Sequence, residues 1–260
     1  MNDTPVIGVL GGMGPHAGAH FLQRLIALNE TARCDQDHPR VLLYSNSKIP
    51  DRVDALLGTG NSPLPEILAS LDLLADGGAH FATIVCNTAH AYIDDIRAHT
   101  RLPLVDMIAV TAIELQRLHV RRVALLATAG TVHSGVYAKV LDKAGIGMTV
   151  PDARLQAMIS AAIFDPQRGI KARSSPCDPY TLDQLATVSH ALLESGDVDT
   201  LLIACTELSI AFHDPELAHL PGVDALDATA RACLSLANDA RPAGPATGID
   251  PHAFEPGVLR

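Results

Sequence analysis

Two hydrophobic patterns alternate along this chain. Short runs of consecutive apolar residues predict buried strands, while apolar residues spaced three or four apart predict amphipathic helices. Strands are expected at 5–12, 40–46, 80–86, 121–128 and 198–205, and helices at 16–32, 62–79, 88–100, 134–145 and 224–239. Strands that are apolar along nearly their whole length and alternate with helices are typical of parallel sheets covered on both faces. We therefore expect an α/β fold.

An internal repeat divides this pattern into halves. ATIVCNTAH at 82–90 and TLLIACTEL at 200–208 both read as a strand that ends in a cysteine and continues into a threonine-bearing turn. Downstream, LPLVD at 102–106 matches LPGVD at 220–224, which places an aspartate 20 residues after Cys86 and 19 after Cys205. Upstream, VIGVLGGMG at 6–14 resembles RVALLATAG at 122–130. Three landmarks in the same order, at near-equal spacing, predict two similar lobes.

The repeat sets the expected domain boundaries. We expect a first lobe of residues 1–106 plus the last helix at 224–240, and a second lobe of residues 107–223. Each is expected to be a parallel-sheet α/β sandwich, so the molecule has two pseudo-symmetric lobes with an active site in the cleft between them. The Pro/Gly-rich tail at 241–260 is expected to be flexible.

Composition and charge narrow the range of partners. A net charge of −10 argues against a nucleic-acid surface or an anionic membrane, but permits a small anionic substrate held by a few local cations. Neither a signal-peptide pattern nor an apolar run of about 18 residues occurs, so we expect a soluble cytoplasmic protein. The five cysteines form no CxxC and the twelve histidines no HExxH, so neither a disulfide framework nor a metal site is expected.

The two repeated cysteines are the main candidates for chemistry. Ligands of open parallel sheets bind beyond the carboxyl ends of the strands, where Cys86 and Cys205 are both expected. If the lobes face each other, the two thiols confront one cleft from opposite sides. Such a mirrored acid/base pair is what inversion at a carbon requires. Because both cysteines precede an expected helix, the helix dipole should favour their thiolates.

Simpler interpretations of these cysteines stay open. A single buried cysteine is most often a packing residue, and the three without a repeat partner, Cys34, Cys177 and Cys233, are expected to be bystanders.

Polar residues follow both repeated cysteines. Asn87, Thr88 and Thr206 could hold a substrate carboxylate. His90 and Glu207 could support the thiols or simply cap helices.

The glycine-rich stretch GVLGGMGPHAG is a weak match to a dinucleotide-binding fingerprint. Its glycines fall as GGxGxxxG, and no acidic residue ends a second strand about 20 positions further on. Close approach of the backbone to a small carboxylate, or a tight turn between strand and helix, accounts better for Gly11 and Gly12.

These motifs together resemble the cofactor-independent aspartate/glutamate racemase superfamily, and within it the aspartate racemase branch. The matching pieces are GGMGP (11–15), YSNSKIPDR (44–52), CNTAH (86–90), LLATAGT (125–131), GIKA (169–172) and ACTEL (204–208). The resemblance implies a two-lobed fold, a two-base mechanism without pyridoxal phosphate or any other cofactor, and a homodimer.

The resemblance also assigns substrate contacts. It implies that Arg52 and Lys171, one cation from each lobe, bind the two carboxylates of the substrate; taken alone, each would be a solvated surface residue. Gly12, Met13 and Thr128, which lie in matching motifs, are further substrate-binding candidates. Two residues depart from the family pattern: His16 replaces a usual aliphatic residue, and Lys48 adds a cation near Arg52.

The expected function is an amino-acid racemase that interconverts L- and D-aspartate, or glutamate, with Cys86 and Cys205 as the two bases. Other activities of the superfamily are maleate cis–trans isomerisation, hydantoin racemisation and arylmalonate decarboxylation, the last with a single cysteine. An alternative of a different class is an inactive two-lobe sensor or binding protein for amino diacids. The cysteine pair and the lack of an export signal favour the enzyme.

Overall fold

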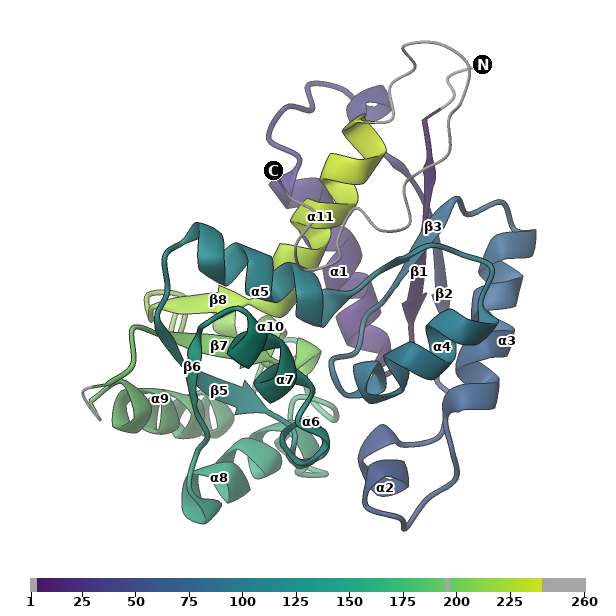
Figure 1. The fold of residues 1–260 in the computed structure, drawn as a ribbon. Helices are drawn as coiled ribbons and strands as arrows, with labels where there is room; N and C mark the ends of the chain where they lie inside the picture. The colour runs from purple at the N-terminus through teal and green to yellow at the C-terminus, as the bar shows by residue number, and fades with distance from the viewer. Residues whose placement is uncertain (1–3, 195–196, 240–260) are drawn as a thin grey trace.

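Two parallel four-stranded sheets form the framework of the protein (Figure 1). The structure is a computed structural model that describes residues 4–194 and 197–239. The strand orders are β2-β1-β3-β4 and β6-β5-β7-β8, so the same topology occurs twice. The expected α/β fold with two similar lobes is confirmed. The tail predicted to be flexible at 241–260 lies outside the described residues, and the lobe boundaries at 106 and 224 stay a prediction.

The elements follow the chain in two matching series. The first comprises β1 Val6–Gly11, α1 Pro15–Leu28, η1 Asp35–Asp37, β2 Arg40–Ser45, α2 Arg52–Leu56, α3 Leu64–Asp76, β3 Phe81–Ile84, η2 Thr88–Tyr92, α4 Ile93–His99, β4 Leu104–Val105 and α5 Met107–Arg117. The second comprises β5 Arg122–Ala127, α6 Ala129–Ser134, α7 Val136–Lys143, β6 Gly147–Thr149, α8 Ala153–Phe164, α9 Pro179–Leu193, β7 Thr200–Ala204, α10 Thr206–Phe212, β8 Gly222–Asp224 and α11 Ala225–Asp239.

The repeated aspartates start equivalent helices. Asp106 accepts hydrogen bonds from the backbone N–H groups of Ile108 and Ala109, and so caps α5. Asp224 accepts one from the N–H of Leu226 at the start of α11, at 2.8 Å. A carboxylate at a helix N-terminus satisfies backbone donors that lack partners within the helix. The sequence landmark therefore marks a strand that turns directly into a helix in each lobe.

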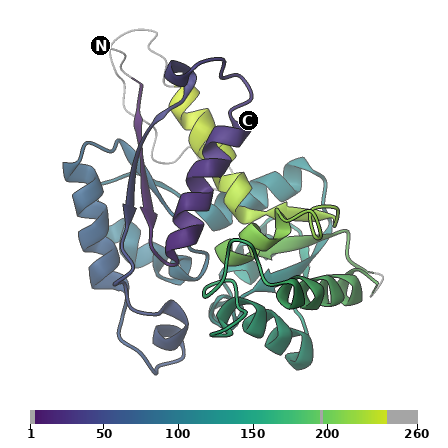
Figure 2. The same cartoon turned by 180° about the vertical axis from the view of Figure 1, so that it is seen from behind.

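The last helix returns to the first lobe. α11 runs beside α1 and α5 (Figures 1 and 2). Its residues Leu226, Ala230 and Cys233 are buried in one apolar cluster with Ile7 and Phe21 of the first lobe. The chain thus crosses between the lobes twice. No helix in the described part of the chain is both long and apolar enough to cross a membrane.

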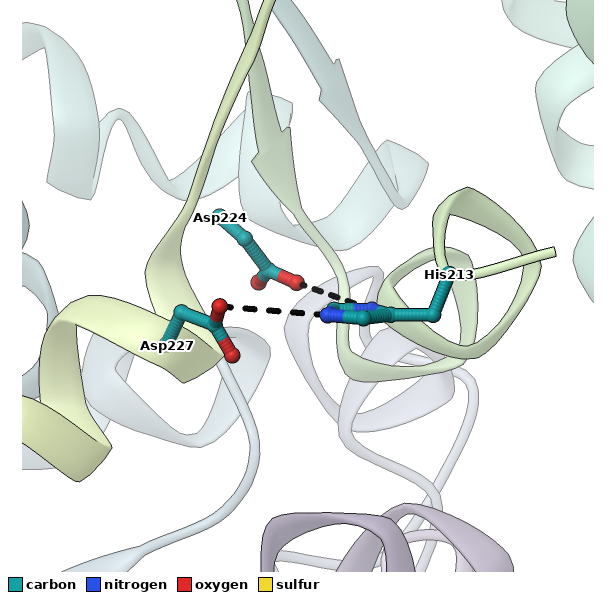
Figure 3. Close-up of side chains that lie close together, drawn as sticks. All are labelled: His213, Asp224 and Asp227. Carbon is teal, nitrogen blue, oxygen red and sulfur yellow. Dashed lines mark ion pairs between the residues drawn. The ribbon is translucent and has the colours of Figure 1, made fainter. Parts of the chain in front are cut away.

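A polar cluster joins the lobes near this crossing (Figure 3). His213, at the end of α10, lies 3.9 Å from a carboxylate oxygen of Asp224 and 3.8 Å from one of Asp227. Arg24 of α1 donates two hydrogen bonds to Asp227, at 2.7 and 2.8 Å. The ring of His20 packs edge-on against His213. The cluster therefore ties α1 to the helix that begins at Cys205.

One predicted helix differs at its start. The segment 88–100 was expected to be helical throughout, but residues 88–92 form a 3-10 turn and α4 begins at Ile93. The turn is tight because the ring Nδ1 of His90 donates a hydrogen bond to the carbonyl oxygen of Cys86, at 2.9 Å. Only one of the two cysteines therefore sits directly at the start of an α-helix.

Candidate active site

Both repeated cysteines line one small cavity between the lobes. Its free space of about 20 Å³ is enough for about one water molecule. The residues around it are Met13, Asp51, Arg52, Val53, Cys86, Asn87, Thr88, Thr128, Phe164, Lys171, Cys205, Thr206 and Glu207. The structure therefore brings together most of the site residues predicted from sequence. The exceptions are Gly12 and His90, which lie next to this cavity but not on its wall.

Cys86 follows β3 at the carboxyl edge of the first sheet and is buried. Behind it, His90 uses both ring nitrogens on the backbone: Nδ1 donates to the carbonyl of Cys86, and Nε2 accepts from the N–H of Met107 at 3.2 Å. Complete burial lowers the pKa of His90, which keeps the ring neutral. His90 thus holds the turn that carries Cys86.

Arg52 brings a buried positive charge to the same wall. Asp51 caps α2, and the guanidinium of Arg52 donates to the carbonyl oxygens of Pro50 at 3.0 Å and Met13 at 3.1 Å. Burial opposes its charge, but Cys86 and Asp51 raise the pKa of Arg52. Its Nε is buried and has no hydrogen-bond partner among the described residues. Buried donors are normally paired, so this atom is suited to donate to an anion.

Asn87 presents a second unpaired donor. The hydroxyl of Tyr137, which reaches over from α7 of the second lobe, donates to Oδ1 of Asn87 at 2.5 Å. Burial raises the pKa of Tyr137, so the phenol stays protonated and acts as a donor. This contact fixes the amide so that Nδ2 is the free end, and Nδ2 is buried without a partner. Two buried donors in one cavity suit an anionic ligand.

Three threonine hydroxyls close the cavity across the lobes. Thr88 of the first lobe lies 3.0 Å from Thr128 and 2.9 Å from Thr131 of the second, measured between hydroxyl oxygens. Thr128 also caps α6 by accepting a hydrogen bond from the N–H of Thr131. The sequence motifs around Thr88 and Thr128 therefore meet in space, although 40 residues separate them.

A hydrogen-bonded chain surrounds Cys205 on the opposite wall. Its thiol donates to Oε2 of Glu207 at 3.3 Å. Oε1 of Glu207 accepts from the ammonium of Lys171 at 3.0 Å and from the backbone N–H of Gly14 at 2.9 Å. Burial alone would raise the pKa of Glu207, but Lys171 and the bonds from Gly14 and Cys205 hold it below its usual value. Glu207 is therefore an anion that links Lys171 to Cys205.

The protonation expected for Cys205 is wrong. The helix dipole was expected to favour its thiolate, and Cys205 does stand at the N-cap of α10. However, complete burial and the neighbouring charge of Glu207 raise the pKa of Cys205 well above its usual value. Lys171 and two backbone N–H groups lower it only in part. Cys205 is therefore a thiol in this structure.

A second, larger chamber adjoins the cavity. It has a volume of about 350 Å³ and shares a wall with the cavity, formed by Met13, Asp51, Arg52, Lys171 and Glu207. Gly12 and His16 line this outer chamber. Gly12 has φ +95°, and a Cβ there would lie 2.3 Å from the backbone of Asn46, so the turn accepts only glycine.

Sequence reasoning missed three residues of the cavity wall, Asp51, Val53 and Phe164, as well as Tyr137, which bonds to Asn87. Tyr137 and Phe164 lie in ordinary helical patterns, and nothing in those patterns marks them. Asp51 stands beside Arg52 before a short helix, and its helix-capping residue type was a usable signal.

Comparison with known proteins gives the family. The model of the Asp/Glu/Hydantoin racemase family matches residues 10–233. The chain belongs to this family. The resemblance drawn from the sequence motifs is thereby confirmed, as is the expectation of an isomerase.

Relatives within this family cover most of the chain. The broad specificity amino-acid racemase RacX of Bacillus subtilis (strain 168) is 26% identical over 235 residues, which is 88% of this chain and 97% of that protein. The aspartate racemase of Picrophilus torridus superposes with a TM-score of 0.79 at 29% identity, covering 90% of this chain and 94% of the other. Glutamate racemase from Francisella tularensis, in complex with D-glutamate, has a TM-score of 0.63 at 15% identity, covering 92% and 82%. This last similarity shows the fold alone.

Proposed function

We propose that this protein racemises aspartate, or a closely related amino diacid, by proton transfer between Cys86 and Cys205 without pyridoxal phosphate. The observation that carries the proposal is the small cavity between the lobes. It has a cysteine from each lobe on its wall, and two further wall residues, Arg52 and Asn87, each have a buried donor, Nε and Nδ2, without a partner among the described residues. The similarity to an aspartate racemase supports the choice of substrate.

Each half of the cavity has a distinct part in this mechanism. Arg52 and Asn87 would hold one carboxylate of the substrate, and Lys171 the other, in competition with Glu207. On one face, the Cα–H bond breaks as an S–H bond forms on a thiolate. On the opposite face, the S–H bond of the second cysteine breaks as a new Cα–H bond forms. The buried donors then stabilise the charge that develops between the two steps.

In this mechanism Cys86 is the first base, because Cys205 is the protonated partner. Arg52 lies on the same cavity wall as Cys86. Cys205 donates a hydrogen bond to Glu207 and so starts as the acid. After one turnover the roles are exchanged, with the proton on Cys86 and Cys205 as the thiolate. Turnover of the opposite enantiomer, or loss of the Cys86 proton to water and uptake of one by Cys205, restores the starting state.

Proton exchange in D2O tests the mechanism. Purified protein is incubated with L- or D-aspartate without added cofactor, and both optical rotation and loss of the α-hydrogen NMR signal are followed. We expect racemisation that survives hydroxylamine, which removes pyridoxal phosphate. Cys86→Ser and Cys205→Ser should each abolish racemisation, with α-hydrogen exchange retained for one enantiomer. A Cys205→Ser protein that interconverts both enantiomers at the parent rate would exclude the two-base mechanism.

One observation favours a broader substrate range. The charge of Lys171 is already paired with Glu207, so the cavity has one cation, Arg52, without a carboxylate partner. An amino acid with a single carboxylate would satisfy Arg52 and leave the Lys171–Glu207 pair intact. The similarity to a broad specificity amino-acid racemase agrees with this. A panel of both enantiomers of aspartate, glutamate and neutral amino acids, with maleate and hydantoins, separates these activities. Binding without turnover of any of them would indicate the sensor.

We also propose that the enzyme is a cytoplasmic homodimer, as expected from the sequence and the family resemblance. Light scattering of the purified protein during gel filtration measures its mass directly. A monomer at micromolar concentration would contradict the dimer.

A further inference from the structure

A connecting segment of the second lobe reaches across the outer chamber. Residues 165–177, between α8 and α9, are called the strap below. The strap is anchored in its own lobe: Ile170 is 1% exposed and Cys177 6%, and both lie in the apolar core of that lobe. Backbone hydrogen bonds from Ile170 to Ala162 and from Lys171 to Ile163 fold its first half against α8. The residues between the anchors carry the contacts to the site.

Two side chains of the strap point in different directions. Lys171 forms its ion pair with Glu207 over the wall of the cavity. Three residues later, the hydroxyl of Ser174 forms a hydrogen bond with Nδ1 of His16, at 2.5 Å. His16 is the second residue of α1, so this bond joins the strap to the first lobe. An aliphatic side chain at this position could not form such a bond.

The hydrogen bond between His16 and Ser174 lies beside the outer chamber. His16, Ile170 and Lys171 all line the outer chamber, which shares a wall with the cavity that contains the cysteines. The chamber holds about 350 Å³, while the cavity has room for about one water molecule. A substrate that reaches the cysteines through the chamber must therefore displace the shared wall, which includes Lys171. The strap carries Lys171, and His16 fastens the strap.

We propose that His16 is a positioning residue of this enzyme: its hydrogen bond to Ser174 fastens the strap to the first lobe and so holds Lys171 over the substrate cavity. The proposal rests on the proposed racemase function for its kinetic consequence only. Loss of an exposed hydrogen bond should change the equilibrium between the fastened and the released strap by about two- to tenfold. His16 thus increases the fraction of time for which the strap is fastened to the first lobe.

Hydrogen exchange of the unliganded protein tests, without reference to activity, whether the His16–Ser174 bond fastens the strap; this bond is called the latch below. We expect amides of the strap to exchange about two- to tenfold faster in His16→Ala and in Ser174→Ala, with no further gain in the double variant. His16→Asn keeps a polar atom near the position of Nδ1 and should restore much of the protection. His99→Ala is the matched control, because His99 is exposed and bonds within its own helix, to the carbonyl of Asp95. Parent-like exchange in both single variants, or additive effects in the double variant, would overturn the latch.

Kinetics give the second readout. We expect the KM for aspartate to rise about two- to tenfold in His16→Ala and Ser174→Ala alike, with a kcat equal to or above the parent value, because an open strap weakens binding but does not touch the cysteines. If His16 instead contacted the substrate directly, Ser174→Ala would keep the parent KM, and the proposal would fail. If the parent protein racemises none of the substrates, the proposed function fails, while the exchange experiment still decides the latch.

Discussion

The second residue after each repeated cysteine distinguishes the two walls of the cavity. Thr88 stands there in the first lobe and Glu207 in the second. Thr88 is a neutral hydroxyl bonded to two other threonines, whereas Glu207 carries a negative charge against Cys205. A duplicated fold therefore supplies two thiols of the same kind, and in the second lobe the charge of Glu207 adds to burial in raising the pKa of Cys205.

Removal of the Glu207 charge should make Cys205 more acidic. In Glu207→Gln the side chain keeps its size, while Lys171 stays close and now favours the thiolate. We expect the pH midpoint of Cys205 alkylation, followed by peptide mass spectrometry, to fall. The kcat should drop about 100-fold, because the carboxylate that accepts the hydrogen bond of the thiol, and so keeps Cys205 protonated, is lost. Glu114→Gln, which alters a surface ion pair on α5, is the control. An unchanged midpoint would show that Glu207 does not govern the thiol.

Gly12 should be replaceable only at a large cost in stability. In Gly12→Ala the new Cβ meets the backbone of Asn46 in a backbone conformation with positive φ. We expect a loss of about 3 kcal/mol or more in the free energy of unfolding, measured by urea denaturation. Gly58→Ala is a matched control: φ is +77°, but nothing lies within 4 Å of the added Cβ, so only about 1 kcal/mol of backbone strain is expected. Equal losses in the two variants would mean that the contact with Asn46 is relaxed at little cost.

At the scale of elements, the helix pair α10 and α11 connects the catalytic wall to the first lobe. α10 begins at Cys205 and ends next to His213, which faces Asp224 and Asp227. The partner Asp227 raises the pKa of His213, whereas burial raises that of Asp224 to about 6. Arg24 of α1 adds a positive charge beside them, whereas burial lowers the pKa of His20 to about 4 and keeps its ring neutral.

This cluster should make stability depend on pH. A histidine with a raised pKa stabilises the fold below its unfolded value of about 6.5, and the contribution is lost as the pH rises through the folded value. Burial raises the pKa of Asp224 from 3.8 to about 6, so this group adds a penalty that grows as the pH rises from 3.8 to about 6 and stays constant above that. We expect His213→Asn to lose up to about 1 kcal/mol at pH 5.5 and much less at pH 8, measured by urea unfolding. His99→Ala should show no such dependence. A loss that grows with pH would contradict the charged pairing.

The sequence alone was sufficient to predict those elements that a single strong pattern marks, such as a run of apolar residues. The strands β1, β3, β5 and β7 were predicted because apolar runs bury both faces of a strand. The strand–cysteine–turn repeat located both thiols. The contacts that decide protonation could not be predicted, because Glu207 meets Lys171, and Tyr137 meets Asn87, only after distant segments pack together. The expected effect of the helix dipole on Cys205 was wrong because desolvation, which a sequence pattern does not report, outweighs it.

At the scale of the whole molecule, the small volume of the cavity predicts that the lobes or the strap move before a substrate binds. The free space between the cysteines holds about one water molecule, which is far less than an amino diacid needs. We therefore expect the binding-competent state to be more open than the structure described. The three threonines and the strap are the contacts that such an opening would separate.

Opening should limit the rate of binding. The chain has no tryptophan, so Phe164→Trp places a single fluorescent reporter on the cavity wall. In stopped-flow mixing with succinate, an unreactive diacid, we expect the observed rate to level off as the ligand concentration rises, because opening precedes binding. A rate that increases linearly to the diffusion limit would show that the small cavity is not a barrier.

The difference between Glu207 and Thr88 has a thermodynamic consequence. Enantiomers have the same free energy in water, so the equilibrium constant of a racemisation is one. The ratio kcat/KM must then be equal for the L- and the D-substrate, however much the two walls of the cavity differ. The charge of Glu207 can therefore never favour one direction of the reaction; it can only raise kcat and KM together for one enantiomer relative to the other.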